Sequence, residues 1–357
     1  MVITGLVLGA VLGYVLQRSR FCVTGAFREV WVSRRTRWLT AFLIVIAVQS
    51  VGVFALDGLG VITLAPESPL PLAAVIIGSL IFGFSIVLAG GCATGTYYRA
   101  GEGLVGSWLA LIFYALFAAV MKYGPLAGAN QGLRSQQLPL TSIHESLGIS
   151  PWLLVGALVA IVGLVTWHHL RKPKLQVAGL PPRRTGLAYV LFEKPWHPFA
   201  SAVVIGVIAI AAFPLSYATG RESGLGITTP SADLMSFLVT GNTDRGFGWG
   251  VMLILGLLVG SFVAARASGE FRLRVPDART AARSVIGGAG MGIGAAWAGG
   301  CTIGNAMVNT ALFSYQGWLA FGFMVLGTGI AARLFILPHR RSGALSSGQP
   351  QSATVPA

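Results

Sequence analysis

Long apolar runs that carry almost no charge are the feature that most constrains this 357-residue chain. Nine such runs can be placed, and a helical run of about 20 apolar residues crosses the roughly 30 Å hydrocarbon core of a membrane. The expected spans are 3–17, 38–56, 71–89, 104–121, 151–169, 199–217, 249–265, 284–300 and 316–337. Because apolar residues are continuous within each run and do not alternate with polar ones, the pattern excludes a transmembrane β-barrel.

The composition indicates the same class of protein. Hydrophobic residues make up 54% of the chain and charged residues only 10%, whereas a soluble domain carries about 25% charged residues. This shortage of charge excludes a soluble globular enzyme, a disordered protein and a coiled coil. The sequence therefore predicts an all-α polytopic membrane protein.

Basic residues are shared very unevenly between the segments that connect the spans. The segments 18–38, 170–198 and 266–284 hold most of them, and the segments 122–150 and 221–248 hold few. Since Lys and Arg accumulate in cytoplasmic loops, we expect the N-terminus outside and the C-terminus in the cytoplasm. Membrane topology thus explains the formal net charge of +14, so we expect membrane lipid and no nucleic acid as a partner.

Two similar motifs indicate an internal duplication. The run LAGGCATG at 88–95 matches WAGGCTIG at 297–304, and each half then holds four spans with the fifth span as a linker. An odd number of spans between equivalent positions places the two halves in opposite orientations. The sequence therefore predicts an inverted repeat about an axis in the membrane plane, as in many transporters.

The expected organisation follows from this repeat. We expect a first repeat at 1–150, a linking helix with a basic cytoplasmic loop at 151–198, a second, inverted repeat at 199–340 and a disordered cytoplasmic tail at 341–357. The tail is rich in Ser, Gly and Pro, which is typical of a segment that cannot bury a core.

Each repeated motif contains a cysteine between glycines, which favour a turn and close backbone approach. The span that ends at Gly300 is too short to cross the membrane, so we expect Cys301 at membrane depth in a broken helix. Irregular backbone is tolerated there only where it is buried or lines a cavity. A new helix after each cysteine would direct its free N–H groups toward that cavity, which suits an anion.

The third cysteine, Cys22, lies in another glycine-containing break, SRFCVTGAF, and has no counterpart in the second half. We therefore expect these residues to bind the transported species: Cys22, Cys92, Cys301, Gly91, Gly95, Gly300, Gly304, Thr94 and Thr302. The candidate mouth residues are Arg20, Arg99 and Arg221. The alternative interpretations are buried structural cysteines, threonines at helix seams and, for Arg20 and Arg99, membrane anchors on the cytoplasmic side. No catalytic residue, metal site or cofactor is expected.

Three stretches resemble one family over roughly residues 1–340: SRFCVTGAF, AGGCATGTYYRAGEG and AGGCTIGN. The chain is similar to the YeeE/YedE family of bacterial inner-membrane sulfur-compound transporters, and most similar to its thiosulfate uptake members. This resemblance implies an hourglass-shaped helical protein with an inverted repeat. It also implies that Cys22, Cys92 and Cys301 relay thiosulfate through transient S–H···S hydrogen bonds, with a small TusA-like sulfurtransferase (YeeD-like) as cytoplasmic partner. The YedE branch is linked to selenium metabolism, so another sulfur or selenium species stays open as substrate.

Two other function classes compete with a transporter. A membrane thiol oxidoreductase would normally show paired cysteines at redox-motif spacing, and the three cysteines have none. A soft-metal carrier would suit thiolates, but Met-rich stretches and acidic mouths are missing from the sequence. Thiols are weak donors, and conduction needs weak binding at several sites, so we expect a thiosulfate transporter and not an enzyme.

Overall fold

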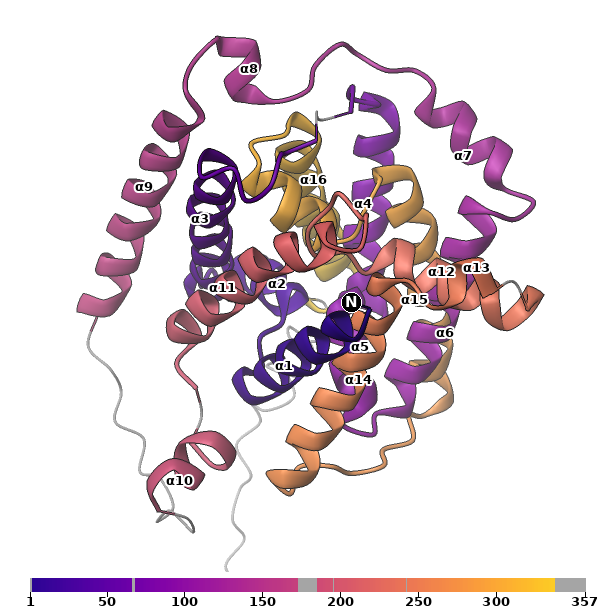
Figure 1. The fold of residues 1–357 in the computed structure, drawn as a ribbon. Helices are drawn as coiled ribbons and strands as arrows, with labels where there is room; N and C mark the ends of the chain where they lie inside the picture. Colours follow the sequence, from indigo (N-terminus) through magenta and orange to yellow (C-terminus); the bar gives the residue numbers. More distant parts are fainter. Residues whose placement is uncertain (1, 66–67, 173–184, 195, 242, 338–357) are drawn as a thin grey trace, which may run out of the picture.

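The computed structural model describes residues 2–65, 68–172, 185–194, 196–241 and 243–337, which form a bundle of helices (Figure 1). These residues contain only helices, connecting segments and three isolated β-bridges. The expected tail at 341–357 and much of the expected basic loop lie outside the described residues. The observed helices agree with the predicted all-α polytopic class.

The helices follow the order of the expected segments. The first part contains α1 (Ile3–Ser19), α2 (Val23–Val32), α3 (Arg37–Gly58), α4 (Leu72–Leu88), α5 (Ala93–Gly101), α6 (Val105–Lys122), α7 (Ala127–Arg134) and α8 (Ile143–Leu147). The middle contains α9 (Pro151–Arg171) and α10 (Gly186–Phe192). The last part contains α11 (Pro198–Tyr217), α12 (Thr228–Thr240), α13 (Thr243–Gly246), α14 (Trp249–Ala267), α15 (Ala278–Ala298), the π-helix η1 (Gly304–Asn309) and α16 (Tyr315–Phe335).

Eight stretches within the described residues are helices long and apolar enough to cross a membrane, whereas nine were expected. Two of the eight, Ile3–Val32 and Leu72–Gly101, are broken pairs made of α1 with α2 and α4 with α5. The exception is the span expected at 284–300. It lies in α15, which is rich in Gly and Ala and packs against both α4 and α6. Packing against α4 and α6, and not a high hydropathy of its own, therefore holds α15 inside the bundle.

Small residues let the helix backbones approach closely. A Cβ atom at Gly9 would overlap the carbonyl oxygen of Leu253, and one at Gly260 would overlap that of Ala10, so α1 and α14 lie backbone to backbone. Glycines of α15 lie in the same way against the backbones of α4 and α6. Such contacts between small residues are the usual means by which membrane helices associate, because lipid provides no hydrophobic force between them.

The connecting segments gather at two opposite ends of the bundle. At one end, Arg20 pairs with Glu102 at 2.7 Å and with Glu270 at 2.8 Å, which joins the ends of α1, α5 and α14. At the same end, Arg18 donates to the carbonyl oxygens of Leu191 and Lys194. We call this end, formed by the described parts of 18–38, 99–105, 169–198 and 266–284, the basic end.

The opposite end joins the remaining connecting segments. Tyr123 after α6 donates to Asp233 of α12 at 2.5 Å, and Ser142 forms a β-bridge with Ser314 before α16. The segments that the charge pattern assigns to two sides therefore lie at two ends of the molecule.

Replacing Gly260 by Ala tests the backbone contact between α1 and α14. The added methyl group would meet the Ala10 carbonyl oxygen, so the helices must separate, and overpacking of this kind costs about 1–3 kcal/mol. We expect a lower midpoint of thermal unfolding in detergent. Gly156→Ala on α9 is the matched control, because nothing lies within 4 Å of its added Cβ. Equal midpoints for the two variants would contradict the close contact.

Candidate functional site

The predicted breaks interrupt the helices at the repeated motifs. The helix α4 ends at Leu88 and α15 ends at Ala298. Each is followed by a glycine with positive φ, Gly90 at +73° and Gly299 at +82°, a region that glycine enters without steric cost. A new helix begins directly after Cys92, whereas after Cys301 the chain first turns and then enters the π-helix η1. The two breaks thus share a glycine turn but continue differently.

Two of the cysteines face one glycine. Cys22 occupies the N-cap position of α2 without a side-chain capping hydrogen bond. Cys92 caps the start of α5, and its sulfur accepts a hydrogen bond from the Gly95 N–H at 3.4 Å. A Cβ atom at Gly95 would lie 3.5 Å from the Cys92 Sγ and 3.8 Å from the Cys22 Sγ. The structure therefore brings both sulfurs to the same side of α5, each within 4 Å of the point that a side chain at position 95 would occupy.

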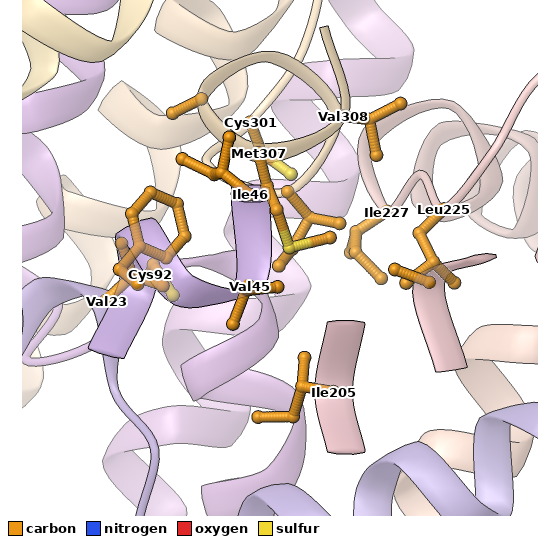
Figure 2. Close-up of a cluster of buried hydrophobic side chains, with 14 of the residues drawn as sticks. Val23, Val45, Ile46, Cys92, Ile205, Leu225, Ile227, Cys301, Met307 and Val308 are labelled. Atoms are coloured by element: carbon orange, nitrogen blue, oxygen red, sulfur yellow. The ribbon is translucent and has the colours of Figure 1, made fainter. Parts of the chain in front are cut away.

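Cys301 belongs to the same buried region. Figure 2 shows Cys92 and Cys301 in one cluster of apolar side chains that also includes Met307. Cys301 is 0% and Cys92 1% exposed, whereas Cys22 is only partly buried. All three are free cysteines. The buried hydroxyl of Thr302 has no hydrogen-bond partner among the described residues. Ile303 and Met307, which follow Cys301, line one gap together with Cys92, so the two Gly-Gly-Cys breaks meet inside the bundle.

The space beside Cys92 is almost completely filled in this structure. A gap of about 10 Å³ is lined by Cys92, Thr94, Gly95, Ile303, Met307 and apolar side chains of α1, α3 and α11. This volume is close to the least space that one water molecule needs, so the gap has no room for a polyatomic ion unless side chains move. The hydroxyl of Thr94 is buried and has no hydrogen-bond partner among the described residues, which leaves it available to a ligand.

A cavity of about 180 Å³ opens beside Cys22 at the basic end. It is lined by Arg20, Cys22, Thr24, Gly25, Arg28, Glu29, Trp38, Gly90 and Arg99. Arg99 donates from Nη2 to the Cys22 Sγ at 3.6 Å and from Nη1 to the Gly90 carbonyl oxygen. Arg20 also lines this cavity, but its guanidinium pairs with two carboxylates. Arg99 is therefore the candidate mouth residue that contacts both a cysteine and a break.

The third candidate mouth residue, Arg221, lies away from the cysteines at the opposite end. Its guanidinium faces the Trp249 ring at 5.5 Å, and its buried Nη1 has no hydrogen-bond partner in the described part of the chain. Burial lowers the pKa of Arg221, yet the group stays charged because guanidinium pKa values lie far above neutrality. Arg221 thus presents a buried cation on that side.

Sequence reasoning missed Arg134 as a site residue. Arg134 ends α7 and donates from Nη1 to the Trp297 carbonyl oxygen at 2.7 Å, directly before the break at Gly299. Asn305 was missed too, and its Nδ2 donates to the Ala298 carbonyl oxygen at 2.6 Å. An amide within an apolar segment was a usable signal for Asn305. No local signal points to Arg134, because it reaches the break from a distant connecting segment.

The remaining glycines fit into the breaks in different ways. A Cβ at Gly91 would lie 3.4 Å from Arg99 Nη1, and one at Gly300 would lie 3.3 Å from the Asn305 side chain. A Cβ at Gly304 would meet nothing within 4 Å. Gly91 and Gly300 therefore allow polar side chains to approach the breaks, whereas the contacts of Gly304 do not require a glycine.

Replacing Gly95 by Ala places a methyl group within 4 Å of the sulfurs of both Cys22 and Cys92. The added Cβ makes only ordinary van der Waals contacts there, and Ala favours a helix more than Gly does, so we expect normal folding. If ions pass between these sulfurs, transport should fall on the order of tenfold, which corresponds to about 1.4 kcal/mol. Gly322→Ala in α16, where nothing lies within 4 Å, is the control. Wild-type uptake by Gly95→Ala would contradict a path at this position.

Comparisons with known proteins identify the family of this chain. The model of the sulphur-transport family matches residues 18–330. The thiosulfate transporter TsuA of Escherichia coli (strain K12) is 52% identical over 343 residues, which cover 96% of this chain and 97% of that protein. TsuA of Spirochaeta thermophila is 33% identical over 342 residues, covering 92% and 97% of the two chains. The probable transporter YedE of Escherichia coli (strain K12) is 38% identical over 115 residues, covering 32% and 28%. The predicted resemblance is confirmed, and the chain belongs to the sulphur-transport (YeeE/YedE) family.

Proposed function

We propose that this protein takes up thiosulfate through the bacterial inner membrane. The observation that carries the proposal is the position of the Cys22 and Cys92 sulfurs around Gly95, with Cys301 in the same buried cluster. The relatives that match nearly the full chain are named thiosulfate transporters, which supports this substrate. The protein acts as a transporter and not as an enzyme.

In this proposal the ion passes the three cysteines in order. It enters at the break held by Arg134, meets Cys301, then Cys92, and leaves past Cys22 into the cavity that Arg99 lines. A thiol is a weak, polarizable donor that suits a soft terminal sulfur and releases it readily. The unpartnered hydroxyl of Thr94 and the N-terminal N–H groups of α5 supply further weak donors along the path.

The proposal includes the inverted repeat and its orientation. The two halves, 1–150 and 199–340, make equivalent contacts, because α1 packs on α14 as α11 packs on α3, and α4 packs on α16 as α15 packs on α6. Such paired contacts support an hourglass of two inverted halves joined through 151–198. We place the basic end in the cytoplasm and the N-terminus outside, as the excess of Lys and Arg favours.

A TusA-like sulfurtransferase (YeeD-like) is the proposed partner at the basic end. The cavity beside Cys22 lies at this end, where the exposed Arg34 and Arg35 provide a positive surface. An ion that leaves past Cys22 would reach a protein docked there without crossing further membrane. Consumption of thiosulfate by that partner would keep its cytoplasmic concentration low, so the thiosulfate gradient across the membrane would stay directed inward.

Two alternatives differ from the proposal in measurable ways. Another sulfur or selenium species would use the same path but compete with thiosulfate for it. A thiol oxidoreductase would form a stable disulfide between two of the three cysteines, which are free in the structure. Thiol counting by alkylation of the native protein and after denaturation distinguishes the oxidoreductase from the transporter.

Replacing a cysteine by Ala tests the relay. Cys92→Ala and Cys301→Ala should lower thiosulfate uptake on the order of tenfold or more, since each removes one weak binding step from the path. Cys22→Ala should act in the same direction. The measurement is uptake of labelled thiosulfate in a strain that lacks other sulfate and thiosulfate importers. Ser79→Ala, at a buried hydroxyl in α4, is the control, and membrane levels of each variant are compared. A folded triple-Ala variant with full uptake would show that the cysteines are structural.

Competition by sulfate tests the proposed selection of sulfur. Sulfate and thiosulfate have the same charge and similar size, so their interaction energies with helix N-termini are nearly equal. They differ in the terminal sulfur of thiosulfate, which is softer and less strongly hydrated than oxygen. A difference of about 1–3 kcal/mol gives a preference of roughly five- to 150-fold for thiosulfate. We expect sulfate to compete poorly with labelled thiosulfate at equal concentration, and an anion with a terminal sulfur to compete well. Displacement by sulfate one for one would refute the selection of soft sulfur.

A further inference from the structure

An apolar groove of about 710 Å³ runs between α3, α9 and α11, apart from the cysteine site. Val48, Val51, Val159, Trp167 and Ile210 are among its lining residues. In Figure 1, α9 stands beside α3 at the edge of the bundle, and it is the least buried of the eight candidate spans. Protein interiors are close-packed, and an apolar space does not hold ordered water. A groove of this size therefore needs an apolar occupant.

Basic and histidine side chains surround the end of this groove. Arg37 Nη2 lies 3.3 Å from His197 Nε2, and its guanidinium lies 6.0 Å from the ring of Phe199, which lines the groove. His169 of α9 lies 3.1 Å from the Thr36 hydroxyl. The side chains of α3, α9 and α11 thus meet in one polar cluster at the basic end.

A second cavity, of about 650 Å³, continues from the groove at this end. Arg37, Lys194 and His197 line it, and Ala200 lines both spaces. Its described lining residues include two cations and no carboxylate. The groove therefore changes along its length from apolar walls to a positively charged recess at the basic end, beside the first residues of α3 and α11.

We propose that the groove and this recess hold one anionic phospholipid, with its acyl chains between α3, α9 and α11 and its phosphate at Arg37 and Lys194. Basic pockets between membrane helices favour anionic headgroups, because each Lys or Arg near the surface contributes about as much as a five-fold gain in affinity. The lipid fills the space beside α9 and joins this helix to the bundle. The inference does not depend on which ion the protein transports.

Native mass spectrometry of the full-length protein tests the proposal. The protein is purified in detergent and equilibrated with equal amounts of phosphatidylglycerol and phosphatidylcholine. We expect one phosphatidylglycerol retained per chain in preference to phosphatidylcholine. Arg37→Gln should weaken retention of phosphatidylglycerol about five-fold. Arg279→Gln, which removes an exposed charge from α15 at the same end, should leave it unchanged.

A second pair of variants tests the groove itself. Nothing lies within 4 Å of a Cβ at Gly163, which lines the groove, or at Gly156, which does not. Both are in α9, so Gly163→Leu should fold and exclude the lipid, while Gly156→Leu should fold and retain it. Equal retention of the two phospholipids, unchanged retention in both Arg37→Gln and Gly163→Leu, or a retained peptide in place of lipid would overturn the proposal.

Discussion

Backbone groups at the helix breaks need hydrogen-bond partners, and the rest of the structure depends on how they are satisfied. In the membrane interior no water replaces a lost helical hydrogen bond. The carbonyl oxygen of Gly90 accepts from Arg99, that of Trp297 accepts from Arg134, and that of Ala298 accepts from Asn305. These polar side chains let two helices end among apolar neighbours. The cysteines lie at the same breaks. The side chains that satisfy the free carbonyl oxygens there are therefore also polar groups along the proposed path.

The two breaks obtain their guanidinium groups in different ways. Arg99 belongs to α5, the short helix that follows the first break, whereas Arg134 comes from α7, which is separate in sequence from the second break. Arg99 also contacts Cys22, and a cavity opens beside it. In the proposed transport path a cation therefore stands at both breaks, while the closed gap between them is lined by apolar side chains, the Cys92 thiol and the Thr94 side chain. Such a barrier would slow a strongly hydrated anion more than a softer one.

Local patterns in the sequence predicted much of this arrangement. The apolar runs located eight helical stretches long and apolar enough to cross a membrane, and the glycine pairs located the turns before Cys92 and Cys301. The ninth expected span, 284–300, lies in the helix α15, but α15 is not among the helices that are long and apolar enough to cross a membrane. The helix α15 is kept in place by glycine contacts with α4 and α6, a stabilisation that hydropathy does not report. Arg134 escaped prediction because its partner is a carbonyl oxygen in the other half of the chain.

The sequence by itself determined the class of protein, the broken helices and the family, because apolar length, glycine turns and the Gly-Gly-Cys motifs are local properties. Only the tertiary structure decided which side chains meet. The approach of Cys22 and Cys92 around Gly95, the contact of Arg99 with Cys22 and the groove beside α9 all depend on how helices pack. That packing is set by the close fit of small residues across helix pairs such as α1 with α14. Residues far apart in the chain supply this fit jointly, so no single segment encodes it.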